Sequence, residues 1–177
     1  MEIVVNDTNV LIDLYEADLL KFCSQLQLEF HTLDVIVEEV TETSQREAVE
    51  SLVKEGSLKV YSLNGLQMLS VMEKVEEYRG ACNLSPEDIS VMLYAKENDF
   101  RLLTGDKTLR AKAILENVKV SGVLYLTDMM VENGIVEPLA MADALEKMIA
   151  SNKRLPIKMI CDKISELRSK NPSNKKC

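Results

Sequence analysis

Short apolar runs alternate along this chain with longer stretches whose apolar residues repeat at helical spacing. The apolar runs predict strands at residues 2–6, 27–33, 58–63, 101–104 and 118–122. Strands separated by helices of roughly 10 to 15 residues are typical of βαβ units, which build a mostly parallel sheet. The sequence therefore predicts an α/β fold, with a parallel sheet of four to five strands flanked by helices.

Helical periodicity fills the segments between these strands and continues after the last one. The predicted helices cover 9–22, 35–55, 65–79, 85–97, 107–116, 122–133, 138–151 and 156–168. A chain of 177 residues fits one domain. We expect that domain at 1–135, a C-terminal helical extension of the same domain at 136–170, and a disordered tail at 171–177.

The composition is that of an ordinary globular protein, because 46% of the residues are hydrophobic and 28% are charged. The N-terminal segment MEIVVNDTNV lacks the basic region and long apolar stretch of a signal peptide. No apolar run approaches the roughly 18 residues that a membrane span requires. We therefore expect a cytoplasmic protein without a membrane anchor.

The net charge of −8 argues against a protein that grips nucleic acid with its whole surface. The charge is uneven, since residues 152–177 carry a net +6 and residues 1–151 carry −14. A basic segment on an acidic body could contact a phosphate backbone. The interpretation that we favour is a solvated last helix with a frayed end.

The histidine and cysteine content disfavours a zinc site. The chain has one histidine, His31, and four widely spaced cysteines without a CxxC pair. His31 stands in the alternating segment LEFHTL, where a structural role is expected.

Four acidic residues occupy positions that this fold could bring to one cleft. Asp7 and Asp106 directly follow predicted strands, and Glu39 and Asp88 lie early in predicted helices. Ligands bind to such sheets beyond the carboxyl ends of the strands. Carboxylates repel one another unless a cation lies between them, and Mg²⁺ prefers oxygen ligands. The pattern predicts a divalent-metal site and a metal-dependent nuclease.

Each acid also has a local structural interpretation. Asp7 and Asp106 could cap the helices that follow them. The segment from Ser85 to Asp88 has the form of a capping box with proline in the first turn. Glu39 could be one charge on a solvated helix. Helix capping alone, however, does not explain two acids at strand ends combined with two on helices.

At these residues the sequence resembles the PIN domain, the Rossmann-like nuclease fold found in many bacterial toxin–antitoxin ribonucleases. The resemblance covers roughly residues 1–120 and keeps the order of the motifs. The matching segments are NDTNVLIDL with Asp7, VIVEEV with Glu39 in preference to Glu38, LSPEDISVMLYAKE with Asp88, and RLLTGDKTLRAKA with Thr104 and Asp106.

The resemblance implies an endoribonuclease that depends on Mg²⁺ or Mn²⁺. Asp7, Asp88 and Asp106 would bind the metal, and Glu39 would be a ligand or would orient the attacking water. Asn9 and Thr104 would donate hydrogen bonds to these carboxylates. The implied partners are an RNA substrate, an antitoxin protein and a second copy of the chain in a homodimer.

Basic residues beside the last motif are candidates for substrate binding. Lys107 and Arg110 would contact the substrate phosphate, and solvated helix charges are the alternative interpretation. Asp128 is an additional acid for which we expect a surface position.

Two other functions compete with the nuclease. A phosphotransferase of the haloacid-dehalogenase type needs a second aspartate two residues after the first, and Asn9 stands there. It also needs a later pair of acids, whereas Asp106 is followed by Lys107. A catalytically silent PIN-like module that binds a protein partner is the second alternative, and the presence of all four acids argues against it.

Overall fold

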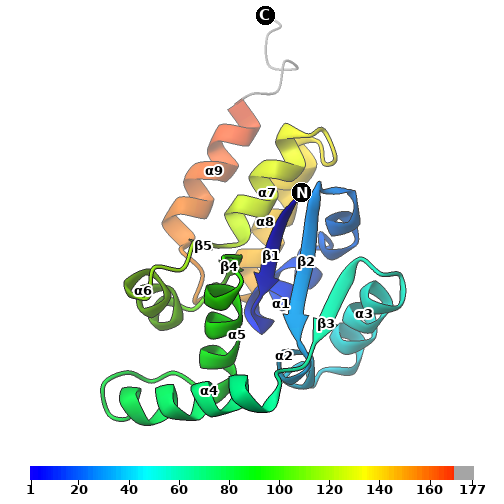
Figure 1. Ribbon diagram of the computed structural model, residues 1–177. Helices are drawn as coiled ribbons and strands as arrows, with labels where there is room; N and C mark the ends of the chain where they lie inside the picture. Colours follow the sequence, from blue (N-terminus) through cyan, green and yellow to red (C-terminus); the bar gives the residue numbers. More distant parts are fainter. Residues whose placement is uncertain (170–177) are drawn as a thin grey trace, which may run out of the picture. The chain divides into compact units, whose positions relative to one another are not determined.

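The computed structural model of the chain describes residues 1–169 (Figure 1). Its centre is a parallel sheet in the order β3-β2-β1-β4-β5. The strands are β1 (Glu2–Asn6), β2 (Leu28–Leu33), β3 (Leu58–Tyr61), β4 (Arg101–Leu103) and β5 (Val120–Ser121). The predicted α/β fold with a parallel sheet is therefore confirmed.

Helices connect and follow these strands (Figure 1). In the first two thirds of the chain they are α1 (Thr8–Glu16), α2 (Asp34–Glu38), α3 (Thr43–Lys54), α4 (Gly65–Tyr78), α5 (Pro86–Glu97) and α6 (Lys107–Leu115). The remaining helices are α7 (Val123–Glu132), α8 (Pro138–Ser151) and α9 (Ile157–Ser169), and a 3₁₀ helix covers Leu20–Gln25. Within residues 1–169, no helix combines the length and apolar character needed to cross a membrane.

The strand order reverses beside β1. The chain proceeds from β1 outward to β2 and β3, then returns to β4 on the other side of β1, where Val5 pairs with Leu102. In parallel sheets, such a reversal opens a crevice at the carboxyl ends of the two strands. Asp7 and Asp106 follow the two strands that border this crevice.

Helix α5 forms the main hydrophobic contact with the sheet. Every residue from Ile89 to Ala95 is buried, and the helix packs against β1, β2 and β4. Its apolar side chains share a core with Val5 of β1, Leu33 of β2 and Leu102 of β4. Because this helix is buried on most sides, its N-terminal turn is held firmly relative to the strand ends.

The helix predicted at 9–22 is wrong in its length. Helix α1 ends at Glu16, and the 3₁₀ helix begins only at Leu20. Asp18 adopts a left-handed conformation with φ 58°, and the Leu19 amide donates to the Leu14 carbonyl at 2.8 Å. The periodic apolar residues continue across this reversal of the backbone, so periodicity alone did not reveal it.

The helix predicted at 35–55 is also interrupted. It divides into α2 and α3, and the connecting residue Val40 is fully buried. Since Val40 must enter the core while the flanking glutamates stay exposed, the backbone leaves the helix after Glu39. This break sets the orientation of Glu39.

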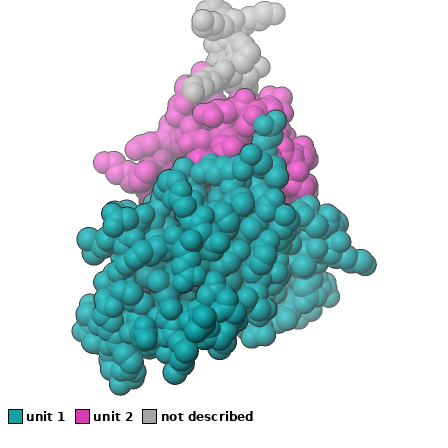
Figure 2. Space-filling view, in the orientation of Figure 1, with its two compact units in different colours: residues 1–12, 27–122 teal, residues 13–26, 123–177 magenta. Residues whose placement is uncertain are grey.

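The chain divides into two compact units, coloured separately in Figure 2. Unit 1 comprises residues 1–12 and 27–122, and contains the sheet; unit 2 comprises residues 13–26 and 123–177. The division that the sequence predicts, at residue 135, stays a prediction. The predicted disordered tail at 171–177 lies outside the described residues.

Candidate active site

Asp7 lies directly after the last residue of β1 and is only 2% exposed. Its backbone amide donates to the Leu103 carbonyl at 3.0 Å, which ties the end of β1 to β4. Its carboxylate Oδ2 accepts a hydrogen bond from the Thr104 hydroxyl at 2.8 Å and a longer one from Asn9 at 3.4 Å. Burial, reinforced by the negative charge of Asp88, raises the pKa of Asp7 to about 6.

Thr104 connects Asp7 to Asp106. The Thr104 side chain is fully buried, and its oxygen accepts the Asp106 backbone amide at 3.0 Å while its hydroxyl donates to Asp7. Asp106 in turn caps α6, because its Oδ1 accepts the Leu109 amide at 2.7 Å. The T-x-D motif therefore fixes the first and last acids relative to one another.

Asp88 lies in the first turn of α5. The predicted capping box is confirmed: the Asp88 carboxylate accepts the Ser85 amide at 2.9 Å, and the Ser85 hydroxyl accepts the Asp88 amide at 3.0 Å. Burial raises the pKa of Asp88, and the negative charge of Asp106 adds to the effect. The negative charge of Asp88 also contributes to the raised pKa of Asp7, so Asp88 interacts electrostatically with both Asp7 and Asp106.

Glu39 reaches the same edge of the sheet from the end of α2. Its carboxylate accepts a short hydrogen bond from the Thr8 hydroxyl, which also lies 3.4 Å from the Ile36 carbonyl. Thr8 is the residue after Asp7, so this bond joins Glu39 to the end of β1. The sequence did not lead us to predict a role for Thr8, although Thr8 directly follows Asp7 in the first motif, NDTNVLIDL. The contact is made by Glu39 and not by its neighbour Glu38.

The two basic candidates differ in their surroundings. Lys107 is exposed at the start of α6. Arg110 is half-buried, and its Nη2 donates to the Thr104 carbonyl at 3.0 Å. That guanidinium lies close to Gly122, where an added Cβ would approach Nη2 to 2.9 Å. Binding of substrate phosphate by Lys107 and Arg110 stays a prediction, and the link from Arg110 to Thr104 was not foreseen.

The chemistry of this donor set fits a hard divalent cation. Each of two acids keeps an oxygen without a hydrogen bond among the described residues, namely Oδ1 of Asp88 and Oδ2 of Asp106. Within residues 1–169, no lysine, arginine or histidine forms an ion pair with Asp7, Asp88 or Asp106. Over the same residues, no three acidic, histidine or cysteine side chains are arranged so that they enclose an ion. The cluster offers oxygen donors and an uncompensated negative charge, which are what Mg²⁺ and Mn²⁺ bind.

Two other residues singled out in the sequence lie in structural contacts. The His31 ring nitrogens contact the Tyr94 hydroxyl at 3.1 Å and the Glu29 carboxylate at 2.6 Å. Asp128 forms an ion pair with Lys163 at 2.7 Å within unit 2. Their side chains are thereby engaged in contacts of the fold.

The chain is similar to solved structures of other proteins, whereas no curated protein matches it. Among solved structures, PAE2754 from Pyrobaculum aerophilum is 24% identical with a TM-score of 0.49, covering 71% of this chain and 93% of that one. VapBC2 from Rickettsia felis, solved bound to a DNA fragment from its promoter, is 10% identical with a TM-score of 0.47, covering 68% and 98% respectively.

A family profile gives the decisive match. The profile of DUF3368, described as a PIN domain, matches residues 3–169. PIN domains are generally nucleases, and they typically use divalent metals. Because the match spans nearly the whole chain, the resemblance seen in the sequence motifs is confirmed, and the chain belongs to the PIN-domain family.

Proposed function

We propose that this chain is a Mg²⁺- or Mn²⁺-dependent endoribonuclease that hydrolyses RNA phosphodiester bonds. The observation that carries the proposal is the environment of Asp7. This carboxylate is buried, repelled by Asp88 and bound by the Thr104 hydroxyl, at the point where the strand order reverses. A buried carboxylate that faces a second negative charge is costly unless a cation compensates the two.

We assign a separate role to each of the candidate residues. Asp7, Asp88 and Asp106 would hold the metal, which would supply an activated water and neutralise charge at the phosphorus. Thr104 and Asn9 orient the Asp7 carboxylate by donating hydrogen bonds to it. Glu39, which accepts a hydrogen bond from Thr8 at the start of α1, would bind the metal or orient the attacking water.

The biological role that we propose is that of the toxin in a toxin–antitoxin pair, with an antitoxin protein as partner and a homodimer as a further assembly. Membership of the PIN-domain family supports this role, because many bacterial toxins of this kind are PIN domains. A second candidate is a silent interaction module. The apolar side chains exposed on α4 favour it, because Leu66 is 78% and Met72 64% exposed.

Cleavage of a mixed RNA pool tests the enzymatic proposal. We expect cleavage with Mg²⁺ or Mn²⁺, none with EDTA, and a loss of at least about 100-fold in Asp7→Asn and Asp106→Asn. Asparagine caps helices as well as aspartate does, so Asp106→Asn should keep α6 intact. Without metal, Asp7→Asn should melt at the same temperature as the wild type or higher, because a buried charge is removed.

The matched control is Glu38→Gln, which removes a neighbouring exposed carboxylate. It should cut RNA at the wild-type rate. Full activity in Asp7→Asn, or cleavage that persists in EDTA, would refute the assignment of the site. A folded wild type that cuts no RNA with either metal would favour the interaction module.

A further inference from the structure

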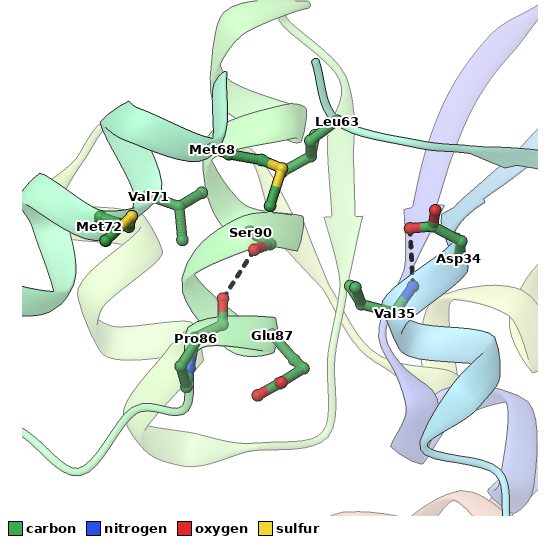
Figure 3. A pocket seen from close by; sticks show the side chains of 9 residues that line it. All are labelled: Asp34, Val35, Leu63, Met68, Val71, Met72, Pro86, Glu87 and Ser90. Atoms are coloured by element: carbon green, nitrogen blue, oxygen red, sulfur yellow. Dashed lines mark hydrogen bonds between the residues drawn. The ribbon is translucent and has the colours of Figure 1, made fainter. Parts of the chain in front are cut away.

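A pocket of about 270 Å³ lies in unit 1 (Figure 3). Its walls come from the start of α2, the loop between β3 and α4, one face of α4, and the first turns of α5. Two of these helices also carry or adjoin candidate acids: Asp88 follows the pocket residue Glu87 on α5, and Glu39 directly follows the last residue of α2. The pocket and the acids therefore share their supporting elements.

The lining combines apolar walls with hydrogen-bond acceptors. Figure 3 shows Met68 and Val71 of α4 facing the α5 residues, with Val35 contributed by α2. The lining contains the carboxylates of Asp34 and Glu87 and no lysine, arginine or histidine. The two carboxylates repel a phosphate group and can accept hydrogen bonds from N–H groups. The lining therefore suits an apolar ring that carries N–H groups on its edge.

Two polar side chains of the lining, Ser90 and Asp34, are held by hydrogen bonds within the protein. The Ser90 hydroxyl donates to the Pro86 carbonyl at 2.7 Å, so its oxygen remains an acceptor toward the pocket. The Asp34 carboxylate accepts the Val35 amide at 2.8 Å and the Ser62 hydroxyl at 2.5 Å. These bonds hold the Ser90 and Asp34 side chains in place before any ligand arrives.

The volume of the pocket limits the size of the ligand that it can hold. Pockets for drug-sized ligands usually measure about 300–1,000 Å³, so this volume suits a single flat ring system. An amphipathic helix of a partner would need a longer groove for side chains spaced over two turns. The thioethers of Met68 and Met72 are polarisable groups that contact aromatic faces favourably.

We propose that this pocket binds one unstacked nucleobase of the RNA strand that is cut at the neighbouring acids, and that guanine fits it best. Guanine presents an N–H and an amino group side by side, and one carboxylate can accept a hydrogen bond from each of them at the same time. Uracil instead presents a single N–H between two carbonyl groups. Single-stranded RNA is commonly recognised through such unstacked bases. The inference rests on the proposed ribonuclease function and adds base selectivity to it.

The first experiment measures base preference. A randomised RNA library is cut by the full chain with Mn²⁺, and the cleavage sites are sequenced. We expect guanine to be preferred at one position beside the cut. Glu87→Gln and Met68→Ala should each reduce the ratio of cutting at guanine over uracil, by about ten-fold for Glu87→Gln.

Leu69→Ala is the matched control for Met68→Ala. Leu69 is adjacent to Met68 on α4, both side chains are 57% exposed, and only Met68 lines the pocket. Leu69→Ala should keep the wild-type preference. Metal-dependent cleavage without a preferred base, or an equal effect of the two alanine variants, would overturn the inference while leaving the proposed nuclease intact.

The second experiment does not depend on catalysis. Guanosine monophosphate and uridine monophosphate are titrated into the chain labelled at its methionine methyl groups, in EDTA, and the NMR signals of Met68 and Met72 are followed. We expect saturable shifts with the guanine nucleotide and much smaller ones with the uracil nucleotide. Equal shifts with the two nucleotides, or no shift with either, would overturn the inference. Signals of Met68 and Met72 that a copurifying protein masks would also overturn it, because they would assign the pocket to a protein partner.

Discussion

Thr104 shows how one hydroxyl group can organise a site at the scale of single residues. It donates to Asp7 and accepts from the Asp106 amide, while its own carbonyl accepts from Arg110. Arg110 is thereby a positioning residue for the Thr104 segment, and burial lowers the pKa of its guanidinium. Displacing Arg110 should disturb the acids without touching any of them.

Gly122→Ala tests this link. The added Cβ would lie 2.9 Å from Arg110 Nη2, the flexible end of a long side chain, so the guanidinium should move away from the Thr104 carbonyl. We expect the fold to persist and the rate of metal-dependent RNA cleavage to fall on the order of ten-fold, because small displacements of reacting groups are costly. Melting temperature and cleavage rate are measured together.

Gly65→Ala is the control for that variant. A Cβ at Gly65 meets no atom within 4 Å, and the residue opens α4. It should leave cleavage unchanged and leave stability equal or slightly higher. If Gly122→Ala also keeps the full rate, Arg110 does not position Thr104.

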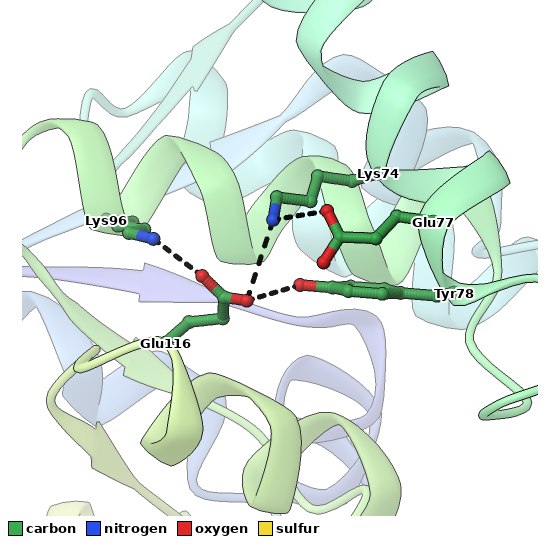
Figure 4. Close-up of polar contacts among 5 residues, drawn as sticks. All are labelled: Lys74, Glu77, Tyr78, Lys96 and Glu116. Carbon is green, nitrogen blue, oxygen red and sulfur yellow. Dashed lines mark hydrogen bonds and ion pairs between the residues drawn. The ribbon is translucent and has the colours of Figure 1, made fainter.

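At the scale of elements, Glu116 joins three helices (Figure 4). From the end of α6, its carboxylate accepts the Tyr78 hydroxyl of α4 at 2.6 Å and pairs with Lys96 of α5 at 2.6 Å and Lys74 of α4 at 3.7 Å. Hydrogen bonds from Lys96 and Tyr78 lower the pKa of Glu116 to about 2. The C-terminal ends of α4, α5 and α6 are therefore held together by one ionised group.

Glu116→Gln should weaken this junction in a pH-dependent way. In the wild type the carboxylate stabilises the folded state fully above its ordinary pKa of 4.5, and this stabilisation is lost as the pH falls toward about 2. We expect the variant to lose about 1–2 kcal/mol of unfolding free energy at pH 7, with the difference disappearing in acid. Urea unfolding of the wild type and the variant at several pH values measures this difference in unfolding free energy.

Glu76→Gln is the control for that measurement. Glu76 pairs with Arg79 one turn away, and both side chains are mostly exposed. Its substitution should change the unfolding free energy by less than about 0.5 kcal/mol at any pH. A constant deficit in Glu116→Gln from pH 7 to pH 2 would show that the ionised carboxylate is not what stabilises the junction.

The elements could be predicted to different degrees for identifiable reasons. Strands such as β1 and the start of α5 were predictable because apolar runs, a proline and a capping box are local signals. The end of α1 at Glu16 was not, because the left-handed Asp18, with φ 58°, interrupts the helix without changing the apolar periodicity of the sequence. The contact of Thr8 with Glu39 depends on how the start of α1 and the end of α2 meet, which local sequence does not encode.

At the scale of the whole molecule, charge limits how RNA is bound. The net charge is −8, and part of the C-terminal basic charge is already paired within unit 2. Lys163 pairs with Asp128 at 2.7 Å, and Arg168 pairs with Glu146 at 2.8 Å. Such a surface offers RNA little electrostatic attraction, so the proposed metal at the acids would have to supply most of the attraction.

Binding of labelled RNA in EDTA tests that consequence. We expect a dissociation constant weaker than about 10⁻⁵ M and little change between 50 and 200 mM salt, because few counterions are displaced. Fluorescence anisotropy measures both. Tight binding in EDTA that salt weakens steeply would instead assign RNA binding to the basic C-terminal segment.

The central claim, that the clustered acids bind a divalent metal, is tested most directly by calorimetric titration of Mn²⁺ into the wild type, Asp7→Asn and Glu38→Gln. We predict saturable binding to the wild type and to Glu38→Gln, and affinity lower by at least about ten-fold in Asp7→Asn, because a ligand charge is lost. No binding to a folded wild type, or equal affinity in Asp7→Asn, would contradict the account.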